Sequence, residues 1–262
     1  MQVSMTNTFP DTGTLTVGSD DDVNQTKANM ESVDFSSKYT SAGTSSNFNI
    51  QKTYSGGRTI SYIAIIGHNI GANGADVVTV KCNNTTKGTL TVSSEYAKSK
   101  VLMFTFAETA SVTDIDVEIA KASSSTQITI TGIMAGEYLD IPNGGEQAGF
   151  PRNYLTRSKK QRVMSNAEGG PVAILSRTFA RPGRLSVKNV TQTFIEADDW
   201  QSFLDMCFDS GYFVFKERDG GDSTDDPASS ALAFDVDLSV KAHAQTRELV
   251  SFDAKFKTYT GT

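Results

Sequence analysis

The sequence predicts a mainly β protein of 262 residues, with an N-terminal β-sandwich followed by a C-terminal antiparallel sheet that carries one amphipathic helix (α+β). Apolar residues occur mostly in short alternating runs, and the segments between these runs are rich in Ser, Thr, Gly and Asn. This is the composition of strands joined by polar turns. A single segment has helical periodicity, and a chain of this length buries a core without disulfides or metals.

Residues 1–45 form the first predicted unit, which is polar. It contains the acidic cluster Asp20, Asp21 and Asp22 and few apolar runs. We expect extended segments, first strands and loops here, or an arm that a neighbouring molecule orders.

Residues 46–145 form the predicted sandwich. The apolar run from Ile60 to Ile66 predicts a central strand that is covered on both faces. Gly132 interrupts the last of the later strands and suggests a bulge. Several strands separated by turn-rich segments favour a β-sandwich. The further predicted strands are residues 75–83, 101–108, 114–120 and 127–139.

A linker is predicted at residues 140–152, where two prolines and three glycines fall within a dozen positions. We place the boundary between the sandwich and the second part within it, so that the second unit comprises residues 146–262.

The second unit combines strands with the one predicted helix. Residues 171–179 and 184–194 resemble a hairpin joined by a turn at residues 180–183. Strands at residues 212–217, 231–242 and 248–260 complete the sheet. The helix spans residues 196–210 and ends before Gly211. Its spacing puts five core residues on one face, namely Trp200, Phe203, Leu204, Cys207 and Phe208.

The net charge of −6 conceals two blocks of opposite sign. Residues 152–188 contain nine basic residues and one acidic residue, whereas residues 189–226 contain ten acidic and two basic residues. Such blocks pair within one fold or across subunits. We predict an assembly interface at Arg152, Arg157, Lys159, Lys160, Arg162, Asp219, Asp222, Asp225 and Asp226. For the basic residues the alternatives are a solvated surface or a nucleic-acid site, and for the acidic residues they are a solvated loop or calcium binding.

Few residues offer catalytic or metal-binding chemistry. There are two histidines, His68 and His243, which is too few for a multi-histidine metal site within one chain. The acidic loop at residues 218–230 lacks the spacing of an EF-hand, and the glycine-rich turns lack the lysine and helix of a phosphate-binding loop. The thirty acidic residues single out no pair for glycoside hydrolysis. We therefore predict no enzyme, no metal and no cofactor.

The two cysteines, Cys82 and Cys207, are each flanked by apolar or small residues and are predicted to be free and buried. The N-terminus lacks the pattern of a signal peptide, and no apolar stretch is long enough to span a bilayer. The acidic balance disfavours nonspecific binding to nucleic acid.

The segment from Gly67 to Ile70, in the motif GHNIG, follows the central strand. With the valines at positions 77, 78 and 80, and with Ile133 and Gly136 further on, it resembles the discoidin-like, galactose-binding-like sandwiches of bacteriophage tail proteins. The resemblance covers roughly residues 30–145. The order of elements in the second unit is similar to that of phage tail-tube, distal-tail and baseplate-hub proteins.

This resemblance implies a virion structural protein of the tail, tail tip or neck, assembled in the host cytoplasm as a ring of copies with other virion proteins as partners. The alternative is a module that binds host-surface glycan through His68 and Asn69, although the loops of the sandwich offer few aromatic platforms. For His68, a structural hydrogen-bonding role at the strand end remains open beside ligand contact.

Overall fold

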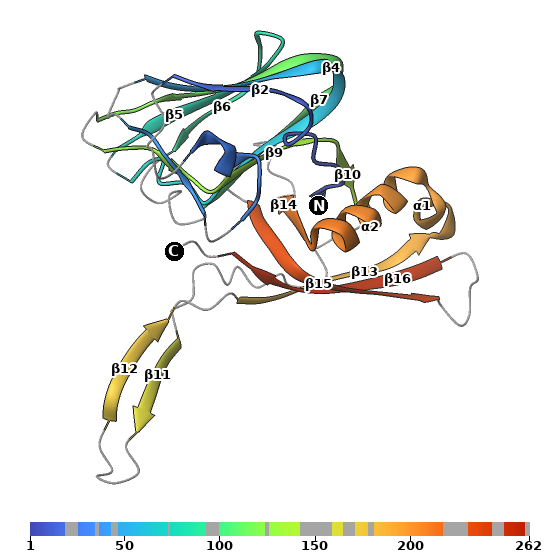
Figure 1. The fold of residues 1–262 in the computed structure, drawn as a ribbon. Coiled ribbons are helices and arrows are strands. Elements are labelled where there is room, and N and C mark those ends of the chain that lie inside the picture. Colours follow the sequence, from blue (N-terminus) through green and yellow to red (C-terminus); the bar gives the residue numbers. More distant parts are fainter. Residues whose placement is uncertain are drawn as a thin grey trace.

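The computed structural model describes residues 1–18, 26–34, 37–42, 47–72, 74–92, 100–123, 126–141, 159–164, 171–177, 181–216, 230–242 and 249–259. The described chain is mainly β, as the sequence predicts, and its strand pairs are antiparallel. Two large sheets and one short strand pair form the body, with the helices packed beside the sandwich on the second sheet, and a second strand pair extends away from it (Figure 1).

The first large sheet forms the sandwich. Its two longest strands, β4 and β7, have twenty residues each and pair along most of their lengths. Residues 101–108 and 114–120 are thus parts of one strand, not the two strands predicted. In sheet order the strands are β2 (Gly13–Val17), β4 (Asn47–Ile66), β7 (Val101–Ala120), β5 (Asp76–Cys82) and β6 (Thr85–Val92), with β9 (Gly132–Gly136) against β4.

β4 and β7 bend, and so pass through both layers of the sandwich. Their register shifts between Thr53 and Tyr62, and both ribbons curve from the outer layer into the layer that carries β9 (Figure 1). Ile50 from the first half of β4, Ile63 from its second half and Val117 of β7 belong to one hydrophobic core. The sandwich is therefore largely one sheet folded over on itself.

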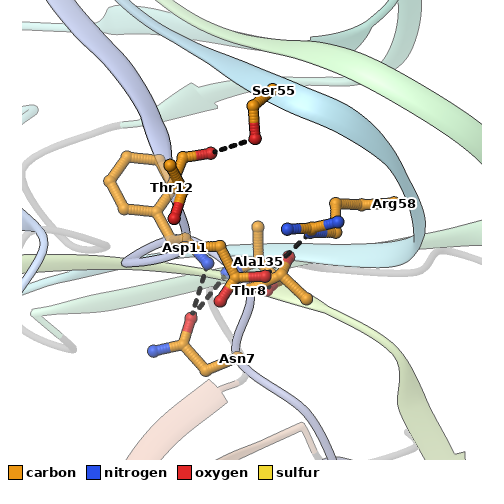
Figure 2. A network of polar contacts seen from close by, with 8 residues as sticks. Asn7, Thr8, Asp11, Thr12, Ser55, Arg58 and Ala135 are labelled. Carbon is orange, nitrogen blue, oxygen red and sulfur yellow. Dashed lines mark hydrogen bonds and ion pairs between the residues drawn. The ribbon is translucent and has the colours of Figure 1, made fainter.

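Polar contacts from the N-terminal segment fasten the bend (Figure 2). Arg58 Nε, within the bend of β4, donates to Asp11 Oδ2 at 2.8 Å. Thr8 donates to the carbonyl of Ala135 in β9 from its backbone N–H at 2.7 Å and from Oγ1 at 3.1 Å. Asn7 Oδ1 accepts from the N–H of Ala135 at 3.3 Å. The segment before β2 therefore ties β4 to β9.

The second large sheet takes strands from all three predicted units. β1 and β10 come from the units predicted as arm and sandwich, yet β1 pairs with both β10 and β14. Val3 and its neighbours are buried, so the first five residues are not a free arm. The order is β10 (Tyr138–Asp140), β1 (Gln2–Ser4), β14 (Tyr212–Lys216), β15 (Ser230–Ala242), β16 (Leu249–Thr258) and β13 (Arg181–Thr191).

The second half of β4 lies between two cores. Ile63 and Ile65 face the sandwich core, whereas Tyr62, Ala64 and Ile66 face a second core, shared with the second sheet and the helices. All five side chains are fully buried, which confirms the predicted strand covered on both faces. The predicted division at residue 146 is consequently not a division of the hydrophobic core.

The predicted helix is two helices, α1 (Gln192–Glu196) and α2 (Asp198–Ser210), separated at Ala197, whose ψ of 146° is extended. α2 ends at Gly211, as predicted, where φ is +70°. Trp200, Phe203 and Cys207 are buried as expected.

The predicted burial of Phe208 is wrong, because its side chain is 76% exposed. At 100° per residue, Phe208 lies about 140° around the helix from Phe203, the centre of the buried face. Met206 takes its place in the core, and Leu204 is partly buried at the edge.

Three short elements complete the fold. β3 (Tyr39–Thr40) pairs with β8 (Thr129–Ile130), and the 3-10 helix η1 (Lys27–Met30) buries Met30 in the sandwich core. Gly132, predicted as a bulge, begins β9, where the chain leaves the β3–β8 pair to join β4.

β11 (Lys159–Met164) and β12 (Pro171–Arg177) form a hairpin that projects away from the body (Figure 1). The predicted hairpin between residues 171–179 and 184–194 is therefore wrong. Residues 181–183 of its supposed turn, among them Pro182 and Gly183, lie within β13, and β13 pairs with β16.

Cys82 and Cys207 are buried free thiols, as predicted. Burial raises the pKa of Cys82 to about 11 and that of Cys207 to about 12. In the part of the chain that the structure describes, no helix has the length and apolarity to cross a membrane.

Candidate functional site

A groove of about 370 Å³ lies at one end of the outer layer of the sandwich, across β4, β7 and β5 and beside the end of β2. Its lining includes exposed and half-buried polar side chains from three adjacent strands. The described residues that line it are Gly18, Asn47, Phe48, Asn49, Val77, Thr79, Glu118, Ile119 and Ala120.

Small residues make the hollow. Ala120 lies opposite Asn47 on one side and Val77 on the other, so a methyl group occupies the middle of this row. Gly18 continues the sheet beside Asn49, to whose carbonyl its N–H donates at 2.7 Å. Larger side chains at Ala120 or Gly18 would fill the space.

The next row along the strands supplies the polar groups. Glu118 lies opposite Asn49 of β4 and Thr79 of β5. Glu118 Oε1 accepts from Lys81 Nζ at 2.5 Å, and its side chain remains 43% exposed. Thr79 Oγ1 lies 3.3 Å from Thr89 Oγ1. An amide, a carboxylate and hydroxyls on one flat face provide both donors and acceptors for a polyhydroxylated ligand.

Asp116 extends this polar face by one more row, where it lies opposite Lys81. Its pKa is raised, first by burial and then by the neighbouring Asp114, while a hydrogen bond from Asn49 opposes the shift. A carboxyl with a raised pKa is found in some catalytic sites and also in structural networks. Here Asp116 is only 4% exposed, which makes it a support for Asn49 rather than a group that a ligand reaches.

The described residues contain no group of three or more His, Cys, Asp or Glu side chains placed to hold a metal ion. Among the described residues the groove lining has one aromatic residue, Phe48, which is 3% exposed and belongs to the sandwich core. This part of the lining therefore offers polar contacts and a small apolar floor, but no exposed ring for stacking.

The predicted ligand residues His68 and Asn69 lie elsewhere, in the loop after β4, and neither lines the groove. The His68 ring is buried, and burial together with the Lys100 charge lowers its pKa to about 3. Asn69 donates from Nδ2 to the carbonyl of Gln127 at 2.7 Å and accepts from the N–H of Thr129 at 2.9 Å. Asn69 thus fastens the loop, whereas neither ring nitrogen of the buried His68 has a hydrogen-bond partner among the described residues. The contact of these two residues with a ligand stays a prediction.

The predicted interface residues fall into two groups. Lys159, Lys160 and Arg162 lie on β11 of the projecting hairpin. The remaining ones lie outside the described residues, namely Arg152, Arg157, Asp219, Asp222, Asp225 and Asp226.

Sequence reasoning missed the groove, although the signal was present. Residues 47–54 alternate polar and apolar side chains around Phe48 and Ile50, and Glu118 stands between Val117 and Ile119. This period-two pattern is typical of strands with one solvent-facing side. The pattern does not tell which strands lie side by side in the sheet. Glu118 and Asn49 are neighbours only because β7 pairs with β4.

No protein-family model and no curated protein matches this chain. Among solved structures, a Ruminococcus gnavus GH29 fucosidase in complex with fucose is 12% identical, with a TM-score of 0.42, over 53% of this chain and 28% of that one. Chitosan-binding module 1 of a chitosanase/glucanase from Paenibacillus sp. IK-5 is 11% identical, with a TM-score of 0.41, over 50% of this chain and 99% of the module. A CBM32 module from Clostridium perfringens in complex with GalNAc-β-1,3-galactose is 9% identical, with a TM-score of 0.40, over 50% of this chain and 100% of the module. Because these TM-scores are below 0.5, the functions proposed next rest on this chain's own surfaces.

Proposed function

We propose that this chain is a structural subunit of a tailed-phage particle and assembles with copies of itself in the tail, tail tip or neck. The hairpin β11–β12 is the observation that carries the proposal. Its two strands pair with each other in a sheet of their own and extend away from the body (Figure 1).

An isolated two-stranded hairpin is at best marginally stable in water. The strands of this hairpin contain Val163, Ile174 and Leu175, which are apolar residues that favour a packed surface. A second surface, supplied by a neighbouring subunit, would stabilise them. The body that bears the hairpin is held together by the core that the sandwich shares with the second sheet, which suits a rigid building block.

The charge pattern supports the same proposal. The basic block at residues 152–188 includes both hairpin strands, and the acidic block at residues 189–226 follows directly. When each copy carries both signs, copies attract one another head to tail, and such contacts close into a ring when the rotation between neighbours allows it.

Assembly is tested by native mass spectrometry and negative-stain electron microscopy of the purified chain at low and high salt. We expect oligomers that weaken as the salt concentration rises. A variant in which a short Gly-Ser linker replaces residues 159–177 should stay monomeric. A wild-type chain that is monomeric under all conditions, and absent from any particle, would contradict the proposal.

We propose glycan binding by the groove as a second function, because Asn49, Thr79 and Glu118 form an open polar row above a small apolar floor. Sugar hydroxyls both donate and accept, and this row offers both kinds of partner.

A glycan array followed by titration calorimetry tests this second function. Ala120→Glu should fill the groove and weaken binding at least tenfold. Thr16→Glu adds the same charge at an exposed position of β2 outside the groove and should leave binding unchanged. If Asn69→Ala abolishes binding and Ala120→Glu does not, the loop after β4 is the site instead. No signal from any glycan removes this function.

A further inference from the structure

Helix α2 has one face that nothing in the described chain covers. Trp200, Phe203, Met206 and Cys207 point into the shared core, whereas the opposite side faces solvent. On that side Phe208 is 76% exposed, and it is the one large hydrophobic side chain that is exposed among the described residues.

The surroundings of Phe208 on α2 are acidic. Asp205 precedes it by three residues and Asp209 follows it, and both are exposed. Asp198 and Asp199 are exposed in the first turn, and no lysine or arginine occurs anywhere in α2. Within the described residues none of these four aspartates forms an ion pair. An exposed aromatic ring among unpaired carboxylates fits a partner that is both apolar and basic.

The hairpin β11–β12 has that composition. Its strands, KKQRVM and PVAILSR, contain four basic residues and no acidic residue, together with valines, an isoleucine, a leucine and a methionine. The whole chain carries a net charge of −6, so this segment differs in sign from the rest of the molecule.

The hairpin and α2 of one molecule lie apart. The hairpin projects from the side of the second sheet remote from α2 (Figure 1). A contact between them therefore joins two copies, and each copy keeps one free hairpin and one free helix for further neighbours. This is a heterologous contact of the kind that builds rings.

The two elements also agree in length. A six-residue strand such as β11 spans about 20 Å at roughly 3.3 Å per residue. The thirteen residues of α2 span about 20 Å at 1.5 Å per residue. One strand of the hairpin is thus long enough to cover the exposed face of the helix from end to end.

We propose that the exposed face of α2, centred on Phe208, is the docking surface for the hairpin β11–β12 of a second copy of this chain. The inference rests on the proposed assembly function and names the surface that assembly uses. Phe208 supplies the apolar contact, and Asp205 and Asp209 attract the basic residues of the hairpin strands.

The test compares surface variants by native mass spectrometry and sedimentation velocity. Phe208→Ser, and separately Asp205→Lys with Asp209→Lys, should each weaken self-association at least tenfold. Glu108→Lys reverses another exposed charge, on β7 of the sandwich, and should leave association unchanged. A thermal unfolding midpoint equal to that of the wild type confirms that the fold of each variant is intact.

A charge exchange identifies the occupant. A chain with Lys159→Glu and Lys160→Glu should not associate with itself, but it should associate with the Asp205→Lys, Asp209→Lys chain when the two are mixed. Cysteines introduced by Phe208→Cys in one copy and Lys160→Cys in another should form a disulfide between copies on oxidation, even if a charge variant folds poorly.

Two results have distinct meanings. If the wild-type chain forms oligomers that Phe208→Ser and the charge reversals leave unchanged, the docking surface is wrong and the proposed assembly function stands. If the wild-type chain is monomeric and replacing the hairpin changes nothing, both are wrong. Cross-links from position 208 to residues outside the hairpin would also overturn the docking proposal.

Discussion

The two halves of β4 belong to one strand but meet different surroundings. In residues 47–54 the side chains alternate between solvent and the sandwich core, whereas residues 60–66 are buried on both faces. β7 repeats the contrast in reverse order, with Val101 to Phe104 fully buried and Glu118 and Ala120 facing outward. One pair of strands thus builds both the surface that carries the groove and the layer that joins the sandwich to the second sheet.

The contrast shows how this chain divides its tasks. The half that faces solvent can vary its outward side chains without disturbing the core, because each outward residue contacts water and its lateral neighbours. The buried half has no such freedom, since Ala64 and Ile65 pack against different cores on opposite faces. Substitutions in the two halves of β4 and β7 should therefore differ widely in their effect on the free energy of unfolding.

The largest difference is expected for the same substitution at two alanines. Ala64→Glu places a carboxylate in the core shared with the second sheet and should cost more than about 4 kcal/mol of unfolding free energy. Ala120→Glu, at the exposed end of β7, should change stability by less than about 0.5 kcal/mol. Urea unfolding followed by circular dichroism measures both. Similar losses of unfolding free energy in the two variants would show that the second half of β4 is not buried on both faces.

The turn that ends the buried half offers a smaller contrast. Gly67 has φ of +64°, and a Cβ there would lie 2.1 Å from Thr131 Oγ1. Gly67→Ala should cost about 2 to 4 kcal/mol, because strain in the left-handed region adds to overpacking. Gly211 has a similar φ of +70° but open space around it, and Gly211→Ala should cost about 1 kcal/mol. If thermal unfolding shows the same loss of stability for both variants, overpacking against Thr131 does not contribute at Gly67.

His68, next to this turn, should make the protein sensitive to acid. Its pKa of about 3 in the folded chain lies below the value of about 6.5 in an unfolded chain. Between these values the unfolded chain binds a proton that the folded chain does not bind. Stability is therefore fully present above about pH 6.5 and falls by about 2 kcal/mol between pH 7 and pH 5.

The comparison of wild type with His68→Phe isolates this contribution. Asp116 and Glu137 have raised pKa values and act in the opposite direction, since they favour the folded chain as the pH falls. Both variants retain these carboxyls, so the difference between their stability curves reports His68. Parallel curves in urea unfolding from pH 5 to pH 7 would contradict the burial of the ring.

Local patterns in the sequence predicted much of this fold. The run from Ile60 to Ile66 predicted a strand covered on both faces, and Gly211 predicted the end of α2, because each signal depends on neighbouring residues alone. The outward register of Phe208 was mispredicted because the stripe of apolar residues on α2 is broad, and only packing against the second sheet selects Met206 instead.

The shared core and the groove depend on contacts between distant residues. Gln2 lies opposite both Asp140 and Lys216, and nothing in a three-residue strand announces such partners. Asn49 and Glu118 likewise meet through strand order alone. The sequence shows the alternation of polar and apolar residues around Asn49 and around Glu118, but it does not show that their strands are neighbours.

The place of β1 in the middle of the second sheet has a consequence for synthesis. β1 is made more than 200 residues before β14, its second partner, and must wait for that strand. At roughly 5 to 20 residues per second, that delay lasts about 10 to 40 s. The sandwich core can form meanwhile, but Tyr62, Ala64 and Ile66 present an apolar face to solvent until the second sheet forms. Slow translation, or a shortage of chaperones, should therefore lower the soluble yield of this protein even under conditions in which the folded protein is stable.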